Sequence, residues 1–287
     1  MTSPHVSPPF AAHGFHFQVH SPEPDIIAVV NDLLVGFTFA GGLGAPAHRI
    51  DIEQSELGPS HLRVSVDGEE QIATLVAGSL ISHLLIEINE RAAANTPHRI
   101  LLHAGAVRLK PSMGRGTILL PGASHSGKTT LTTALALEGW PFVADEVSAL
   151  NAETLGVDSY GKPVALRPAS VDLFQSQLAR LRTKGSPFDK DERFVPPTEL
   201  GGLNHNAAPV VAFFFPSFQP DCADEFVRLS PGDVLTRLMH SVLNRDGMTP
   251  SVFRSLEAVA RRAPAYYVQF TDMHDAIDKV CSINYTT

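Results

Sequence analysis

The sequence predicts an α/β protein in which a mixed-sheet domain with a phosphate-binding loop follows a small α+β domain. The segment Gly122–Thr129 fits the pattern G-x-x-x-x-G-K-[ST] in full. An apolar run over 117–120 precedes it and a helical pattern over 129–138 follows, which is the strand, loop and helix order that this motif requires. Separate strand and helix patterns precede residue 96, so we divide the chain into domains at 1–96 and 97–287.

The N-terminal domain is predicted from alternating and helical hydrophobic patterns. Strands are expected over 15–19, 49–52, 62–66 and 71–74, and helices over 25–37 and 79–94. Asp67-Gly68 is a hairpin signal between the last two strands. His16 and His20 share one face of the first strand, which leaves open a metal site or a half-buried strand, since no Cys or carboxylate accompanies them.

Composition excludes several classes of function. The 287 residues carry a net charge of −8, so the chain offers no basic field for nucleic acid or an anionic membrane. No run approaches the length of about 18 apolar residues that a membrane helix needs, and the N-terminus lacks a signal-peptide pattern. Cys222 and Cys281 lie far apart without zinc spacing. We therefore expect reduced thiols and a cytoplasmic protein.

The loop is predicted to bind the phosphates of ATP. Its residues are Gly122, Ala123, Ser124, His125, Ser126, Gly127, Lys128, Thr129 and Thr130. The glycines permit backbone angles that turn successive N–H groups toward one anion, and the helix start adds its dipole. We expect Lys128 to reach the β- and γ-phosphates and the Thr129 hydroxyl to ligate Mg²⁺. The alternative is a strand-to-helix turn that binds nothing.

An acidic pair follows the loop helix closely. Gly139 is expected to end the helix, and a strand over 141–144 then leads into Asp145-Glu146, seventeen positions after Lys128. A helix of about ten residues leads the chain away from the phosphates, and a strand of about five residues brings it back over a similar distance. We therefore expect the two acids to lie beside the γ-phosphate. Because neighbouring strand residues point to opposite faces, we assign them different roles.

Taken together, residues 98–150 resemble the catalytic domain of HPr kinase/phosphorylase, a P-loop kinase whose fold is shared with ATP-dependent phosphoenolpyruvate carboxykinase. The resemblance is carried by Leu102-His103-Ala-Gly105, the loop, Gly139-Trp140 and Val143-Ala144-Asp145-Glu146, in that order. The whole chain is similar to HPr-kinase-related proteins of bacterial peptide-modification clusters, such as those that phosphorylate lasso-peptide precursors. This implies an HPr-kinase-like mixed-sheet fold, and it favours a homo-oligomer.

The sequence departs from that family at three points. The family often has Gly at the position of His125 and Asp at the position of Glu146. Both changes are compatible with the chemistry, since Glu is also a hard oxygen ligand. The arginine-bearing signature that accompanies phosphorylase activity is not found, so the resemblance does not extend to dephosphorylation or to HPr as the substrate.

The resemblance also places His103 at the active site, near the transferred phosphate. His103 belongs to an apolar strand predicted over 100–107, where a histidine without this context would be a core or edge residue. The predicted catalytic residues are therefore Asp145, as the base that accepts the hydroxyl proton, His103 and Lys128. Thr129 and Glu146 are the predicted Mg²⁺ ligands.

The rest of the C-terminal domain gives weaker patterns. Helices are predicted over 170–181, 231–243, 250–262 and 272–281, the last capped by Thr271, and strands over 210–215 and 266–270. Residues 183–202, with Lys184, Lys190 and Arg193, are predicted to be a surface loop. This loop is either a solvated connector or a basic lid that closes over phosphates.

The leading hypothesis is an ATP-dependent kinase that transfers the γ-phosphoryl group to a Ser or Thr hydroxyl of a peptide or protein. A small-metabolite kinase with the same fold is the second hypothesis, and the N-terminal domain argues mildly against it because an added domain suits a macromolecular substrate. The third is a nucleotide-binding sensor or assembly subunit. Asp145 and His103 weigh against that one, because binding alone needs neither.

Overall fold

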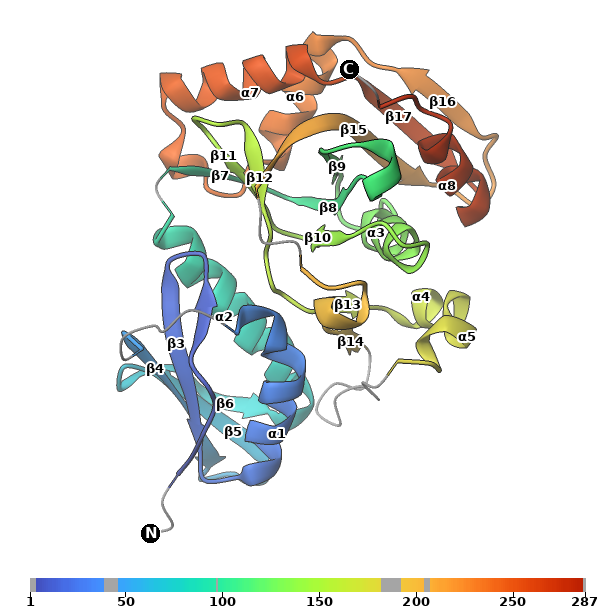
Figure 1. The fold of residues 1–287 in the computed structure, drawn as a ribbon. Helices are drawn as coiled ribbons and strands as arrows, with labels where there is room; N and C mark the ends of the chain where they lie inside the picture. The colour runs from blue at the N-terminus through green and yellow to red at the C-terminus, as the bar shows by residue number, and fades with distance from the viewer. Residues whose placement is uncertain (1–3, 39–45, 97, 182–191, 204–206, 286–287) are drawn as a thin grey trace. The chain divides into compact units, whose positions relative to one another are not determined.

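The chain is described from a computed structural model, and the description covers residues 4–38, 46–96, 98–181, 192–203 and 207–285 (Figure 1). Its contacts divide it into two compact units. The first is Met1–Thr96 with Gly161–Glu199, and the second is Pro97–Tyr160 with Leu200–Thr287. The first boundary coincides with the division made from the sequence at 96, whereas Gly161–Glu199, assigned there to the second domain, groups by its contacts with the first unit.

The first unit contains a twisted sheet in the order β1-β3-β4-β5-β6, with β2 paired to β3. The predicted alternation is confirmed in β3, where Phe15, Phe17 and Val19 are buried while His16 and His20 are partly exposed. Asp67 and Gly68 both have positive φ, as a two-residue hairpin turn requires. The strands are β1 (His5–Val6), β2 (Phe10–Ala12), β3 (Phe15–Ser21), β4 (His48–Ser55), β5 (Gly58–Val66) and β6 (Glu69–Val76).

The two long helices of the first unit bury one apolar face each. They are α1 (Pro24–Leu33) and α2 (Leu80–Ala94), and the short turns η1 (Leu34–Phe37) and η2 (Ala77–Ser79) adjoin them in the chain. Among the residues that α1 buries are Ile26, Val30 and Leu33, and those that α2 buries include Leu84 and Ile88. These spacings of three and four residues are those expected for a helix with one face in a core.

The second segment of this unit corrects two predictions. The helix predicted over 170–181 is instead α4 (Pro168–Leu173) and α5 (Gln175–Leu178), because Phe174 leaves the helical conformation at φ −101° and ψ 16° and buries its ring. Part of the loop predicted over 183–202 is β14 (Arg193–Val195), which pairs with β13 (Val164–Leu166) and is followed by η4 (Pro197–Glu199). Lys184 and Lys190 lie outside the described residues.

The second unit contains a mixed sheet, which confirms the coarse α/β prediction. Its order is β10-β8-β9-β15-β12-β11-β7, with β17 paired to β15 and β16 to β17. In this sheet β15 runs parallel to β9 and to β17, and the other pairs are antiparallel. The strands are β7 (Arg99–Leu102), β8 (Ala104–Arg108), β9 (Thr117–Pro121), β10 (Phe142–Ala144), β11 (Ser148–Asn151), β12 (Gly156–Asp158), β15 (Ala208–Phe218), β16 (Glu225–Arg228) and β17 (Ala265–Phe270).

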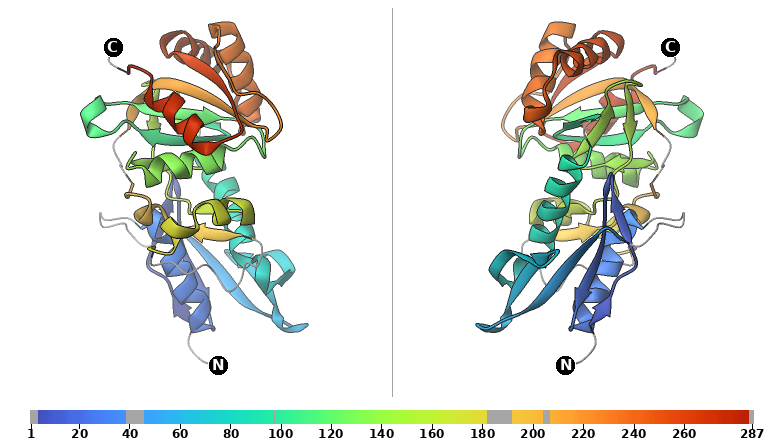
Figure 2. Two further views of the ribbon diagram at one scale, coloured as in Figure 1. Left: turned by 90° about the vertical axis from the view of Figure 1, so that its right-hand side faces the viewer. Right: turned by 90° about the vertical axis from the view of Figure 1, so that its left-hand side faces the viewer.

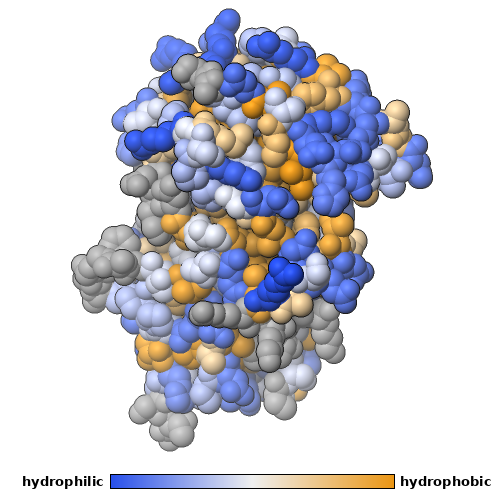
Figure 3. All heavy atoms as spheres, turned by 45° about the vertical axis from the view of Figure 1, so that its right-hand side comes forward, coloured by the Kyte–Doolittle hydropathy of each residue, from blue (hydrophilic) through white to orange (hydrophobic). Residues whose placement is uncertain are grey.

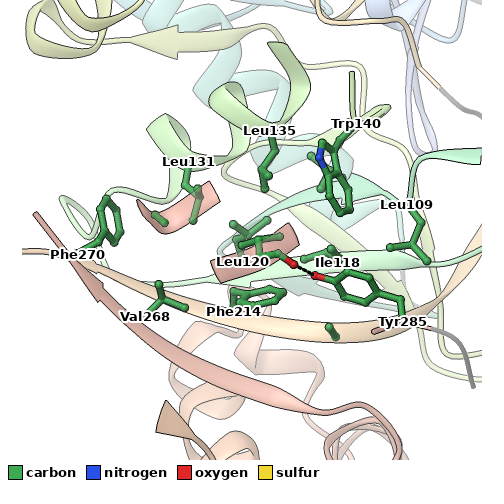
Figure 4. Packing of buried hydrophobic residues seen from close by; sticks show 14 residues of the cluster. Leu109, Ile118, Leu120, Leu131, Leu135, Trp140, Phe214, Val268, Phe270 and Tyr285 are labelled. Atoms are coloured by element: carbon green, nitrogen blue, oxygen red, sulfur yellow. Dashed lines mark hydrogen bonds between the residues drawn. The ribbon is translucent and has the colours of Figure 1, made fainter. Parts of the chain in front are cut away.

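Helices cover both faces of this sheet. They are α3 (Lys128–Leu137), α6 (Pro231–Ser241), α7 (Pro250–Arg262) and α8 (Met273–Cys281), with short turns η3 (Pro111–Met113) and η5 (Arg245–Gly247). Figure 2 shows α3 and α8 on one face, and α6 with α7 beside it on the other. Phe214 joins the cluster that includes Leu131 of α3 and Val280 of α8 (Figure 4), whereas Arg237 of α6 lies 5.5 Å from the centroid of the Phe215 ring.

Two local predictions in this unit have different outcomes. The end of α3 at Gly139 is confirmed, because Gly139 has φ 87° and the amides of Gly139 and Trp140 bond to the carbonyls of Ala136 and Leu135. The predicted cap of the last helix is wrong by one residue. Asp272 caps it instead, since its carboxylate accepts from the amide of His274 at 2.7 Å.

The strand predicted over 100–107 is also corrected. It divides at His103 into β7, which pairs with β11, and β8, which pairs with β9 and β10. The free edge of β7 is covered by the chain after α6, because Leu243 N–H donates to Leu101 O and the Asn244 side chain bonds to the backbone of Leu101 and Arg99. His103 therefore stands at the junction of two parts of one sheet.

On the face drawn in Figure 3, hydrophilic and hydrophobic residues are interspersed. Within the described residues, no helix is both long enough and apolar enough to cross a membrane.

Candidate functional site

The phosphate-loop motif has the predicted local structure. The strand β9 ends at Pro121, the loop follows, and α3 begins at Lys128. Gly127 precedes the helix with φ 88°, in the left-handed region that favours glycine. Lys128 is 6% exposed. The outer part of the loop is exposed and the remainder is partly exposed: Ala123, Ser124 and His125 in the first group, and Gly122, Ser126, Gly127, Thr129 and Thr130 in the second.

Two loop positions show why this segment needs particular residues. A Cβ on Gly122 would lie 2.5 Å from Ser126 Oγ, so any other residue there would force the Ser126 side chain to move. His125 adopts φ 66°, also in the left-handed region, which a side chain disfavours. Glycine at this position would adopt that backbone angle without the steric cost of a side chain.

A close approach seats α3 on the sheet. A Cβ on Gly105 of β8 would lie 2.0 Å from Thr132 Oγ1 of α3, which is below any contact that real atoms tolerate. The glycine therefore allows the loop helix to pack directly on the strand that follows His103. The sequence singled out Gly105 only through the resemblance, and this contact supplies its structural role.

Buried polar groups join the strands beneath the loop. The Arg108 guanidinium of β8 donates to Thr117 Oγ1 of β9 and to Val157 O of β12, the latter at 2.8 Å. Burial lowers the pKa of Arg108 to about 10. This role of Arg108 has no signal in the sequence, because an arginine at the end of an apolar strand usually reaches solvent. Its bonds fix β9, and with it the start of the loop, within the sheet.

The acidic pair occupies a tight turn rather than the predicted strand. The strand β10 ends at Ala144, and Val147 N–H then donates to Asp145 O at 2.8 Å across Glu146, whose φ is 68°. Such a three-residue turn with positive φ is rare and strained. Asp145 is 3% exposed and Glu146 is exposed. The two acids thus have the different environments expected, but a turn rather than strand alternation separates them.

The loop helix and the acidic turn meet directly. Thr129 Oγ1, in the first turn of α3, donates to Asp145 Oδ2 at 3.1 Å. The hydroxyl predicted to ligate Mg²⁺ and the carboxylate predicted to act as base are therefore adjacent. A hydroxyl and a carboxylate are hard oxygen donors of the kind that Mg²⁺ prefers, so these residues fit the ion. The metal role assigned to Glu146 stays a prediction.

His103 connects the same groups. Its Nδ1 lies 3.2 Å from Glu146 O, and because a carbonyl oxygen only accepts, Nδ1 carries a proton in this contact. Its backbone carbonyl accepts from Gly122 N–H at 3.4 Å, and its N–H donates to Ser241 O at 2.7 Å. The structure thus brings His103 into contact with the start of the loop and with the acidic turn. Ser241, at the end of α6, has no sequence signal for this position.

The metal site considered at His16 and His20 gains no further ligand among the described residues. His16 and His20 lie on the same partly exposed face of β3, as predicted. Burial lowers the pKa of His20 from its usual value. The described part of the chain contains no group of three or more His, Cys, Asp or Glu side chains arranged to hold a metal ion.

Comparison with known proteins does not identify the chain. No protein-family model matches it, and no curated protein matches it at a significant level.

Proposed function

We propose that this protein is an ATP-dependent kinase that transfers the γ-phosphoryl group to a Ser or Thr hydroxyl of a peptide or protein, with an HPr-kinase-like fold. One observation carries the proposal: the start of the phosphate-loop helix and the acidic turn meet through the bond between Thr129 and Asp145. A buried carboxylate at the helix start favours a site for magnesium nucleotide over a loop that binds phosphate alone. A kinase needs one beside the γ-phosphate.

In the proposed reaction, the loop amides and Lys128 hold the phosphates of ATP. Thr129 and Glu146 would hold Mg²⁺ directly or through water, and the ion would neutralise charge on the phosphate oxygens. Asp145 takes the proton of the acceptor hydroxyl while the hydroxyl oxygen attacks the γ-phosphorus. The bond from that phosphorus to the bridging oxygen then breaks, and ADP leaves.

His103 has a positioning role in this scheme. Its Nδ1 lies 3.2 Å from Glu146 O, and in the proposed reaction its Nε2 interacts with the transferred phosphate. The contact also connects the acidic turn to the strand junction. Because phosphoryl transfer depends on positioning and charge neutralisation, a fixed turn matters more here than an unusual acidity.

The test uses γ-labelled ATP and Mg²⁺ in a cytosolic extract of the host, with the full chain and its Asp145→Asn variant. Asp275→Asn, an exposed carboxylate on α8, is the matched control. We expect label in a peptide or protein band, stable to acid and labile to strong base, that is lost only with Asp145→Asn. Label in a small soluble compound would select the metabolite kinase. If the protein binds nucleotide but no label transfer is sensitive to Asp145→Asn, the proposed kinase activity is contradicted.

A further inference from the structure

Two aromatic residues end the parallel strands next to the phosphate loop. In the sheet, β9 is parallel to β15 and β15 to β17, so their carboxyl ends lie at one edge. The loop follows β9, and Phe218 and Phe270 are the last residues of β15 and β17 and stand opposite each other in the register. Ligands of open α/β sheets bind at the carboxyl ends of such strands.

The side chains of both residues lie beside Gly127, which precedes the loop helix. A Cβ on Gly127 would lie 3.0 Å from Phe270 Cζ and 3.2 Å from Phe218 Cβ. Phe218 N–H also donates to Ser126 O at 3.0 Å, which ties the end of β15 to the loop backbone. Phe218 is therefore adjacent to the loop that is predicted to hold the phosphates.

The two rings differ in exposure. Phe270 is 0% exposed and belongs to the core cluster, where Figure 4 shows it at one end near Leu131. Phe218 packs on it with ring centroids 5.7 Å apart, yet is 46% exposed. An exposed phenylalanine alone would need no explanation. This one combines exposure with a place beside the predicted phosphate site.

The segment that carries Phe218 is held in place on its far side. Gln219 N–H donates to Phe270 O at 3.1 Å, and Gln269 Nε2 donates to Ala223 O at 2.7 Å. Asp224 accepts from Thr271 N–H at 2.9 Å. Phe218 N–H and Gln219 N–H are bonded to the loop and to the end of β17, so the backbone that carries the ring is held before any ligand arrives, which lowers the entropy cost of binding.

We propose that Phe218 is the platform on which the base of the bound nucleotide stacks, and this inference rests on the function proposed above. A base stacks well on an aromatic ring whatever its identity, because every base has a π-face. The phosphates of an inorganic donor would gain nothing from such a ring. The platform therefore assigns a nucleoside triphosphate, rather than pyrophosphate or another polyphosphate, as the phosphoryl donor, with little discrimination between bases.

The test compares a nucleotide with its bare phosphate chain. Affinities of the full chain for the β,γ-imido analogue of ATP and for inorganic tripolyphosphate are measured calorimetrically with Mg²⁺. Removal of the ring in Phe218→Ala should weaken nucleotide binding roughly 5- to 100-fold and leave tripolyphosphate binding unchanged. Phe253→Ala, at a comparably exposed ring on α7, is the matched control and should change neither affinity.

A second variant tests contact with the base directly. Trp140 is the only tryptophan of the chain and is buried, so Phe218→Trp adds one exposed indole. This variant should bind the nucleotide as tightly as the parent, and its fluorescence should change with the nucleotide but not with tripolyphosphate. Equal responses to the two ligands would overturn the platform.

The two proposals fail in different ways. The first case is that tripolyphosphate binds to the parent chain and its binding is lost in Lys128→Ala. If Phe218→Ala then weakens the binding of both ligands or of neither, the platform is wrong and the phosphate site stands. If tripolyphosphate does not bind at all, or binds equally well to Lys128→Ala, the phosphate site is wrong and the platform falls with it.

Discussion

Thr129 Oγ1 and Asp145 Oδ2 are joined by a hydrogen bond of 3.1 Å, which connects the first turn of the loop helix to the buried acid of the following turn. The bond places a hydroxyl and a carboxylate from separate elements at one point. Each alone has an ordinary structural explanation, since a threonine is common in a first turn and an acid is common in a bend. Their contact beside a phosphate-loop helix is what a phosphoryl-transfer site requires.

The first prediction concerns that carboxylate. Asp145→Asn keeps an oxygen that can accept from Thr129, so folding and binding of magnesium nucleotide should persist. Loss of the proton acceptor should lower the rate of transfer about 10²- to 10⁴-fold. Nucleotide affinity by calorimetry and label transfer measure the two effects. Lys128→Ala is the contrast and should lose affinity itself; equal loss of affinity in both variants would contradict the role given to Asp145.

The second prediction concerns the packing of the loop helix α3 on the strand β8. Gly105→Ala inserts a Cβ 2.0 Å from Thr132 Oγ1, so α3 must move away from β8. Overpacking of this kind should lower the free energy of unfolding by about 1–3 kcal/mol. Adding Thr132→Ala removes the Oγ1 atom and should restore part of the lost stability. The recovery should be incomplete, because the Cβ of residue 132 remains 3.1 Å from the new atom. Denaturant unfolding of both single variants and the double variant measures the coupling. Additive losses would show that the two sites do not touch.

Local rules account for the parts of the fold that the sequence predicted well. The phosphate loop, the end of α3 at Gly139 and the hairpin at Asp67-Gly68 each depend on a few neighbouring residues whose backbone angles are dictated by glycine. Long periodic segments such as α7 were equally clear. In these places, the information is contained within about ten consecutive residues.

The strand boundaries and side-chain contacts that the sequence did not predict depend on residues that are distant in the sequence. Residues 100–107 form an apolar run compatible with one strand, and only pairing with β11 on one side and β9 on the other divides it at His103. The strand β16 has every residue exposed and so gave no alternating pattern. Within the candidate site, residue types and spacing predicted Thr129 and Asp145, but nothing local could indicate that the two side chains touch.

The third prediction concerns alkaline pH. Burial is the main cause that raises the pKa of Tyr285 above its usual value, and its hydroxyl donates to Val280 O at 2.6 Å. Above pH 10, the tyrosine of the unfolded chain ionises while the folded one stays protonated, so stability is present below that pH and lost above it. One such group costs about 1.4 kcal/mol per pH unit.

Thermal unfolding measured from pH 9 to pH 11 tests this assignment. Tyr285→Phe should flatten part of the decline, because phenylalanine cannot ionise, while losing some stability at pH 9 through the missing hydrogen bond. Tyr267→Phe, which removes a less buried hydroxyl from β17, serves as the control. A decline as steep in Tyr285→Phe as in the parent would refute the proposed origin.

The fourth prediction separates strain from chemistry at Glu146. Its φ of 68° is unfavourable for any residue with a Cβ, and such strain costs about 1–3 kcal/mol. Glu146→Gly relieves the strain, whereas Glu146→Ala keeps it, and both remove the carboxylate. We therefore expect the glycine variant to be more stable than the alanine variant by about 1 kcal/mol after the entropy cost of glycine. If the carboxylate helps to hold Mg²⁺, transfer should fall in both variants.

Unfolding in denaturant and label transfer at several Mg²⁺ concentrations distinguish these contributions. His125→Gly provides a comparison for strain and metal binding, because His125 has a similar φ of 66° in the loop but is not among the predicted Mg²⁺ ligands. It should gain stability without the increased Mg²⁺ requirement expected of the Glu146 variants. Unchanged transfer in both Glu146 variants would remove this residue from the metal site, and Asp145, already bonded to Thr129, would then be the acid that holds the ion.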